Sequence, residues 1–292
     1  MHQVLANGIV TGCSYALVAY GFGLIYNTTR TFHFAHGAAY AFCVYMFFSL
    51  KNIPAVPVWL AIILSIALTG LLGVLIDEFT YRPLVKKKSS LLLQLLSSLA
   101  VYMIIVNVII MIYGNETKVL NQQIQRTLTI GGIILSEYQV ATVVCALSLL
   151  FLVALGLRIT RVGKMIRALR DDPELISVLG VNQQYLRWLI FGLGSVLAGV
   201  AAVLQGLDVG TYPHAGMIMF LNGAVAVIIG GKGIFEAGIF GALILGVLQT
   251  LAVWQFSARW DEAAAFLLLV FFLLWRPAGI FGRKRRIEEL EA

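Results

Sequence analysis

The feature that most constrains this chain is the length of its stretches without Asp, Glu, Lys or Arg. A helix needs about 20 predominantly apolar residues to cross the hydrocarbon core of a bilayer. Eight charge-free runs reach that length, so the sequence predicts eight membrane-spanning helices. The runs are 1–29, 31–50, 52–76, 89–115, 138–157, 188–207, 209–231 and 237–258.

A ninth run, 263–275, has only 13 residues and completes a span only if Trp260, Asp261 and Glu262 lie at the membrane interface. The composition agrees with a membrane protein, because 60% of the residues are hydrophobic and 12% are charged. Soluble domains are typically about 45–50% apolar and about 25% charged. We therefore expect residues 1–292 to form a single all-α, polytopic membrane domain with eight or nine spans.

The distribution of Lys and Arg predicts the orientation of these spans, because basic residues concentrate on the cytoplasmic side of membrane proteins. If the N-terminus lies outside and the spans alternate, 17 of the 21 Lys and Arg residues fall on the inner face. The basic tail at 276–292 then lies in the cytoplasm. The net charge of +7 reflects this topology and not nucleic-acid binding.

The most informative polar segment, 158–187, joins the fifth and sixth runs and lies on the predicted inner face. Its first half carries an apolar stripe at helical spacing, made of Val162, Met165, Ile166 and Leu169. A second helix is predicted to follow, with Asp172 as its N-cap and Pro173 as its first residue. Gly180 is its stop signal. We expect two short helices with a corner at Asp171–Pro173. This shape favours docking onto a partner protein over a helix that lies on the lipid surface.

No motif for catalysis or for energy conversion is evident. No segment matches the G-x-x-x-x-G-K-[ST] pattern of a phosphate-binding P-loop. Cys13, Cys43 and Cys145 lie inside apolar runs, and no Cys/His cluster has the spacing of a metal site. Carriers driven by protons or sodium usually need carboxylates within the membrane. The predicted spans carry almost none, which disfavours a secondary carrier.

The segment 31–45, TFHFAHGAAYAFCVY, places two histidines in an apolar run. His33 and His36 are three residues apart and share one face if the segment is helical. Gly37 allows the backbone to depart from a regular helix, and broken helices line cavities in transporters. We expect the second span to be interrupted near His36–Gly37, with the break facing a solute pathway. The alternatives are a hydrogen-bonded pair with a structural role and a metal site.

The sequence resembles the permease subunits of bacterial ABC importers for branched-chain amino acids, the LivH/LivM type. FHFAHGAAYAF at 32–42 is similar to the I-N-F-A-H-G segment of that family. GKMIRALRDDPELISVLGVN at 163–182 is similar to its cytoplasmic segment. LAGVAAVLQG at 197–206 and VIIGGKGIFEAGIFGALILG at 227–246 are similar to its glycine-rich C-terminal half. The match covers most of the chain.

The resemblance implies a non-enzymatic transport subunit of the bacterial inner membrane. Two such permeases, often nonidentical, form the pathway, a periplasmic binding protein delivers the solute, and two cytoplasmic ATPases bind the inner loops and use ATP and Mg. No cofactor is expected in this chain. The residues implied in coupling to the ATPases are Gly163, Arg167, Ala168, Arg170, Asp171, Asp172, Glu174 and Gly180, and those implied in the pathway are His33, Phe34, His36, Gly37, Gly230, Gly231 and Gly233.

The sequence also departs from the family pattern. His33 stands where Asn is usual, which leaves the identity of the solute open. Leu175 and Ile176 replace the two alanines of the E-A-A-x-x-x-G signature. Lys232 lies within the Gly-Gly-x-Gly turn, and Ile234 replaces the usual Ser or Thr. The alternative to an ABC permease is a self-contained carrier or channel for small polar solutes such as urea.

Overall fold

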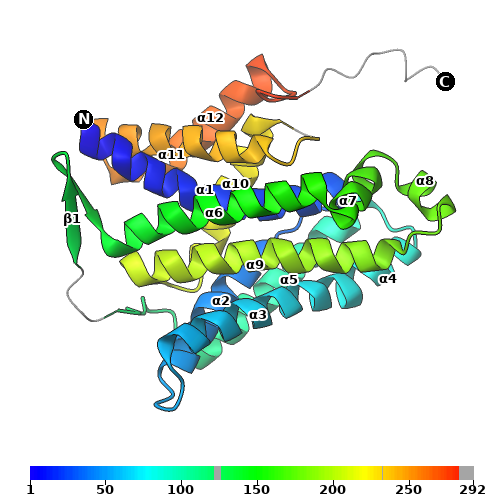
Figure 1. The fold of residues 1–292 in the computed structure, drawn as a ribbon, viewed down its shortest axis with the longest axis horizontal. Helices are drawn as coiled ribbons and strands as arrows, with labels where there is room; N and C mark the ends of the chain where they lie inside the picture. The colour runs from blue at the N-terminus through cyan, green and yellow to red at the C-terminus, as the bar shows by residue number, and fades with distance from the viewer. Residues whose placement is uncertain (122–125, 232, 283–292) are drawn as a thin grey trace.

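The structure is a computed structural model that describes residues 1–121, 126–231 and 233–282. It is a bundle of helices that run roughly along one axis, with a short β-hairpin at one end (Figure 1). Lys232 and residues 283–292 of the predicted basic tail lie outside the described residues. The elements are α1 His2–Thr29, α2 Ala35–Lys51, α3 Val58–Ile76, the π-helix η1 Asp77–Tyr81, α4 Arg82–Lys86, α5 Leu91–Tyr113, β1 Thr127–Ile130, β2 Ile133–Ser136, α6 Glu137–Ile159, α7 Arg161–Asp171, α8 Pro173–Val178, α9 Gln183–Val209, α10 Ala215–Gly230, α11 Ala237–Gln255, the 3-10 helix η2 Ala258–Trp260 and α12 Asp261–Trp275.

Each of the nine predicted runs contains a helix. Among the described residues, six helices are long and apolar enough to cross a membrane, when α3, η1 and α4 are taken as one continuous helix. The helices α2, α10 and α12 are shorter, with 17, 16 and 15 residues. At 1.5 Å per residue, α2 is about 26 Å long, whereas the hydrocarbon core is about 30 Å thick. Both α2 and α10 are short because a non-helical segment precedes them, at 30–34 and at 210–214.

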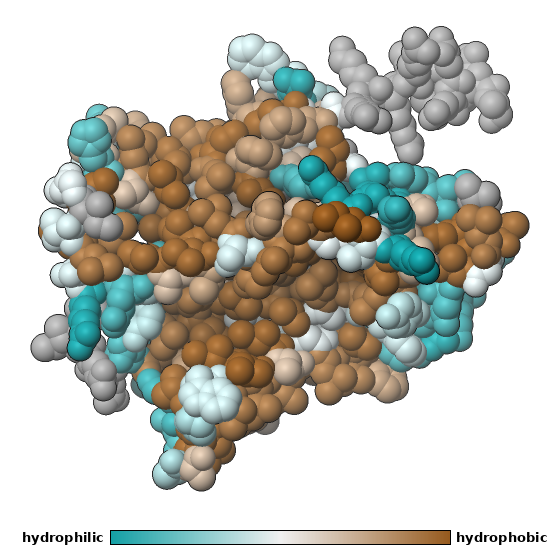
Figure 2. Space-filling view, viewed as in Figure 1, coloured by the Kyte–Doolittle hydropathy of each residue, from teal (hydrophilic) through white to brown (hydrophobic). Residues whose placement is uncertain are grey.

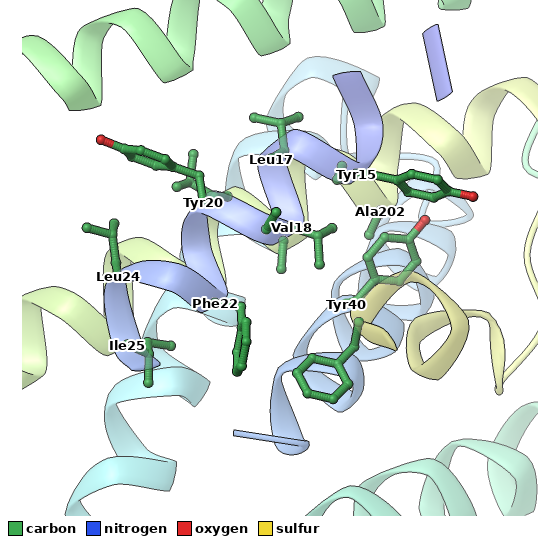
Figure 3. Close-up of a cluster of buried hydrophobic side chains, with 14 of the residues drawn as sticks. Tyr15, Leu17, Val18, Tyr20, Phe22, Leu24, Ile25, Tyr40 and Ala202 are labelled. Carbon is green, nitrogen blue, oxygen red and sulfur yellow. The ribbon is translucent and has the colours of Figure 1, made fainter. Parts of the chain in front are cut away.

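The first helix, α1, is the centre of the bundle and contacts α6, α9, α10 and α11. Most of its length is buried, and Figure 3 shows side chains from several of its faces within the hydrophobic core. Glycines allow this burial by close backbone contact. A Cβ atom built on Gly12 would lie 2.9 Å from Leu243 Cα of α11, and one on Gly21 would lie 2.6 Å from the Gly194 carbonyl oxygen of α9.

The outer surface of the bundle is a broad apolar belt with polar residues gathered towards its two ends (Figure 2). Large apolar side chains on α5, α6 and α12 are exposed, including Met111, Phe151 and Leu274. A soluble monomer rarely exposes a contiguous apolar surface of this size. An apolar belt of this kind is typical of helices that lie in a bilayer.

One element was not predicted, because the sequence analysis expected only helices. β1 and β2 form an antiparallel hairpin in the loop between α5 and α6. Gly131 and Gly132 join the strands with φ angles of 59° and 82°. Two consecutive residues with positive φ form a tight turn whose twist matches that of the strands. The sequence TLTIGGIILS carries this signal, since a Gly-Gly pair separates two β-branched runs.

The π-helix η1 has a cause in the sequence. Pro83 lies in the first turn of α4, inside the continuous helix from Val58 to Lys86. A proline in a helix interior donates no hydrogen bond and its ring clashes with the carbonyl group four residues earlier. The wider η1 turn, in which the Arg82 N–H donates to the Asp77 carbonyl oxygen, accommodates the proline without ending the helix.

The close packing of α1 against α11 generates a stability prediction. A Cβ on Gly246 would lie 2.4 Å from the Gly12 backbone nitrogen, whereas a Cβ on Gly156 of α6 meets no atom within 4 Å. We expect Gly246→Ala to lower the melting temperature of the purified protein, because overpacking costs about 1–3 kcal/mol. Gly156→Ala should leave that temperature unchanged or raise it, because alanine favours helix. Equal effects of the two substitutions would contradict the packing described.

Candidate functional site

The first candidate site is the non-helical segment that joins α1 to α2. Arg30 ends α1 in the left-handed conformation, with φ 58°, and the chain then runs without helical structure to Phe34. The interruption predicted near His36–Gly37 is therefore wrong by a few residues. His36 and Gly37 lie in the first turn of α2, and the break precedes them. His33 and His36 still face one another, with ring centroids 5.8 Å apart, and both are fully buried.

Gly37 allows close approach of α10 and does not bend α2. A Cβ on Gly37 would lie 2.8 Å from the Gly216 carbonyl oxygen, and a Cβ on Gly216 would lie 2.0 Å from the Gly37 carbonyl oxygen. Gly216 is the second residue of α10. The first turns of the two short helices therefore touch inside the bundle. Neither glycine tolerates a side chain without a backbone shift.

His33 belongs to a buried hydrogen-bond network that joins three elements. The Tyr81 hydroxyl donates to Ser98 Oγ at 2.7 Å, and the His33 Nδ1–H donates to the Tyr81 oxygen at 2.7 Å. This assignment places the His33 proton on Nδ1, because the Tyr81 proton is already engaged. Ser98 Oγ also accepts from the Ala35 N–H at 3.1 Å, which satisfies one free donor at the start of α2.

His36 has no such network. Neither ring nitrogen has a hydrogen-bond partner among the described residues, and His33 Nε2 is also unpartnered. The rings of Phe22 and Phe220 lie near the imidazole, at centroid distances of 6.5 and 6.4 Å. A buried, unsatisfied polar group costs about 1–3 kcal/mol, so packing alone does not explain a histidine here.

The two groups of predicted pathway residues lie at opposite ends of α10. Gly216, which touches Gly37, is near its start, and Gly230 is its last residue, about 21 Å away at 1.5 Å per residue. Gly231 packs against the backbone of Ala278 and Gly282. Gly233 donates its N–H to Asn27 Oδ1 at 2.9 Å. The structure therefore does not place Gly230, Gly231 and Gly233 beside the histidines.

The second candidate site is the segment 158–187, and its predicted shape is confirmed. α7 and α8 are two short helices, and Asp172 at the corner is extended, with φ −149°. Pro173 is the first residue of α8. Gly180 adopts φ 74° just after α8 and donates its N–H to the Ser177 carbonyl oxygen. This left-handed conformation explains why a glycine ends the second helix.

The face of α7 predicted to meet a partner instead contacts this chain. Ile166 and Leu169 are buried in the main hydrophobic cluster. Arg167 donates to the Leu157 carbonyl oxygen. Arg170 donates to the Gly233 carbonyl oxygen at 2.9 Å and stacks on Phe235, with its guanidinium carbon 5.0 Å from the ring centroid. Gly163 also packs against Leu157, where a Cβ would lie 2.3 Å from the carbonyl oxygen.

The exposed residues of the segment lie elsewhere on α7 and α8. On α7 the exposed residues include Lys164, Ala168 and Asp171. At the end of α8, Val178 and Leu179 are 82% and 69% exposed. We call this exposed pair the apolar tip, and it coincides with the brown patch at the α8 end of the molecule in Figure 2. Glu174 lies within α8, between the corner and the apolar tip.

A third cluster was missed by the sequence analysis. The fully buried Asp77 of η1 forms an ion pair with Arg187 of α9, and Gln184 Nε2 donates to Asp77 Oδ2 at 3.1 Å and to Glu78 Oε2 at 3.0 Å. The Trp188 indole N–H also donates to Glu78, at 3.0 Å. The signal in the sequence is weak, because these charges only flank apolar runs. Only the packing of α3 against α9 brings them together.

Comparisons with known proteins agree with this architecture. The sequence profile of the family described as "Branched-chain amino acid transport system / permease component" matches residues 4–273. The high-affinity branched-chain amino acid transport system permease protein BraD of Pseudomonas aeruginosa is 29% identical, over 96% of this chain and 95% of BraD. LivH of Salmonella typhimurium, a permease protein of the same description, is also 29% identical, over 96% of this chain and 95% of its own.

The fold also has a relative of solved structure. PsaBC from Streptococcus pneumoniae, in complex with Fab, superposes with a TM-score of 0.51 over 100% of this chain and 95% of the other, at 15% sequence identity. At that identity the likeness concerns the fold alone. The profile match over most of the chain shows that this protein belongs to the family of branched-chain amino acid transport system permease components and is a multi-pass membrane transport subunit.

Proposed function

We propose that this permease forms one half of the translocation pathway of an ATP-driven importer for branched-chain or related amino acids. A second permease, two cytoplasmic ATPases that hold ATP and Mg, and a periplasmic binding protein complete the complex. The names of BraD and LivH support the solute class. The observation that carries the proposal is the apolar tip. Exposed apolar patches mark protein or membrane contacts, and this one lies outside the helices that are long and apolar enough to span.

The proposed orientation places the N-terminus outside, α7 and α8 in the cytoplasm, and the C-terminus in the cytoplasm, with nine spans when α2, α10 and α12 are counted. The segregation of Lys and Arg supports it. The segment 30–34 then re-enters the membrane from the inner end of α1. Non-helical backbone at membrane depth is tolerated where it is buried in protein or lines a cavity. The buried histidines support a pathway role for His33, Phe34, His36 and Gly37.

Thiol labelling tests the orientation. Single cysteines at Thr129 and Lys164, both exposed, would be introduced into a variant without Cys13, Cys43 and Cys145. In intact cells, we expect an impermeant maleimide to reach position 129 in the hairpin and not position 164 in α7. Permeabilised cells provide the control, since both positions should then react. Labelling of position 164 alone in intact cells would reverse the topology.

The apolar tip gives a prediction on complex assembly. Val178→Asp with Leu179→Asp should abolish copurification of the ATPases, because docking would bury two carboxylates without partners. The melting temperature of the isolated permease should not change, since both side chains are exposed. Val119→Asp is the matched control and should retain the ATPases, because Val119 is similarly exposed but lies in the loop between α5 and β1, on the proposed outer side. ATPases that remain bound to the double variant would remove the apolar tip from the interface.

Substitution of His36 distinguishes a role in the pathway from a purely structural role. His36→Leu replaces the imidazole by an apolar side chain of similar size and removes two unsatisfied nitrogens. We expect a higher melting temperature, together with at least about a tenfold loss of uptake in the reconstituted complex, since sites retained for function are often not optimal for stability. His36→Gln should retain part of the uptake. An assembled His36→Leu complex with normal uptake would leave only the structural role.

A further inference from the structure

We propose that the π-helix η1 is a mechanical relay that couples the α7–α8 segment to the buried His33 segment, with Asp77 and Tyr81 as its two positioning residues. This inference rests on the proposed function, since a relay matters only if the ATPases act on α7 and α8. It goes further, because it names the residues that carry movement from the docking segment to the pathway.

The first link joins α8 to α9. The Gln183 side chain donates to the Pro173 carbonyl oxygen at the start of α8. Gln183 is also the first residue of α9, and Asn182 caps that helix. A displacement of α8 therefore acts directly on the first turn of α9. Helix α9 then carries it as a rigid element, because each turn is held by backbone hydrogen bonds.

The second link joins α9 to η1 through a buried charge pair. Both carboxylate oxygens of Asp77 accept hydrogen bonds from Arg187, and Gln184 adds a third. Asp77 is fully buried and the Arg187 side chain is 14% exposed. Breaking such a pair leaves an uncompensated buried charge, so the two helices cannot separate here at low cost. The start of α9 and the π-helix must move together.

The third link joins η1 to the His33 segment. Tyr81, four residues after Asp77, bonds to His33 and to Ser98. Phe191, four residues after Arg187, packs against the same two rings, at centroid distances of 5.2 Å to His33 and 5.5 Å to Tyr81. The Arg187 guanidinium lies over Phe191 at 5.6 Å. The ion pair is therefore linked to His33 in two ways, through Tyr81 and through Phe191.

The relay passes through a π-helical turn, and such turns occur frequently at functional sites. Pro83 holds this turn in π geometry, since an α-helical turn would bring the proline ring against the carbonyl group four residues earlier. The turn therefore moves as one unit with the start of α9. Such a movement would withdraw the Tyr81 hydroxyl from His33.

The test measures ATP hydrolysis and solute uptake together in the complete reconstituted complex. Asp77→Asn and Tyr81→Phe keep the size of each side chain and remove a charge and a hydroxyl. We expect assembly and basal ATP hydrolysis to persist, while the ATP consumed per solute imported rises by about fivefold for Asp77→Asn and by less for Tyr81→Phe. A purely structural role would lower both activities in proportion and leave that ratio unchanged.

Two further variants sharpen the experiment. Phe79→Leu changes an exposed side chain of η1 that takes no part in the three links, so its ratio should equal that of the wild type. The Asp77→Asn, Tyr81→Phe double variant should be no less coupled than Asp77→Asn alone, because two residues in one path are not additive. Additive effects, or an unchanged ratio in both single variants, would overturn the relay. Failure of the wild-type complex to bind ATPases would instead overturn the proposed function.

Discussion

Inside a bilayer, every backbone N–H and C=O group must find its partner within the protein, and the rest of this structure depends on that constraint. It explains why the long apolar runs are helices. It also explains why the two non-helical segments that precede α2 and α10 are held by specific bonds. Ser98 satisfies the Ala35 N–H, and Lys118 and Thr211 exchange backbone hydrogen bonds at the start of the 210–214 segment. Both of these segments therefore have partners for part of their backbone within the protein.

The second consequence of the apolar environment is that helix association relies on close packing. No hydrophobic force drives one apolar helix onto another in lipid, so small residues allow the backbones to approach. Glycines serve this purpose at the contacts of α1 with α11, of α1 with α9 and of α2 with α10. These glycines allow α9 and α11 to approach α1 closely, which places α1 at the centre of the bundle.

Two groups of buried polar side chains are joined across helices. Asp77 with Arg187, and His33 with Tyr81 and Ser98, each connect elements that lie far apart in the sequence. Among the described residues, the His36 nitrogens have no hydrogen-bond partner. Ionisable and polar groups at such depth are expensive, which makes them candidates for function rather than for stability. The proposed pathway and the proposed relay meet at His33, because this residue belongs to the first and bonds to Tyr81 of the second.

The sequence by itself determined the class of the protein, the positions of the apolar helices and the two-helix shape of 158–187. It placed the interruption of the second span near His36–Gly37, a few residues after the non-helical segment 30–34. These features depend on local composition, hydrophobic length and the backbone limits of Gly180 and Pro173, all of which are readable along one stretch of chain.

The tertiary structure decided the rest. It alone showed that non-helical segments shorten α2 and α10 to 17 and 16 residues, and that Gly37 serves contact with Gly216. It also turned the apolar stripe of α7 towards its own bundle and paired Asp77 with Arg187 across 110 positions. These facts could not be read from the sequence, because each depends on which helix faces which.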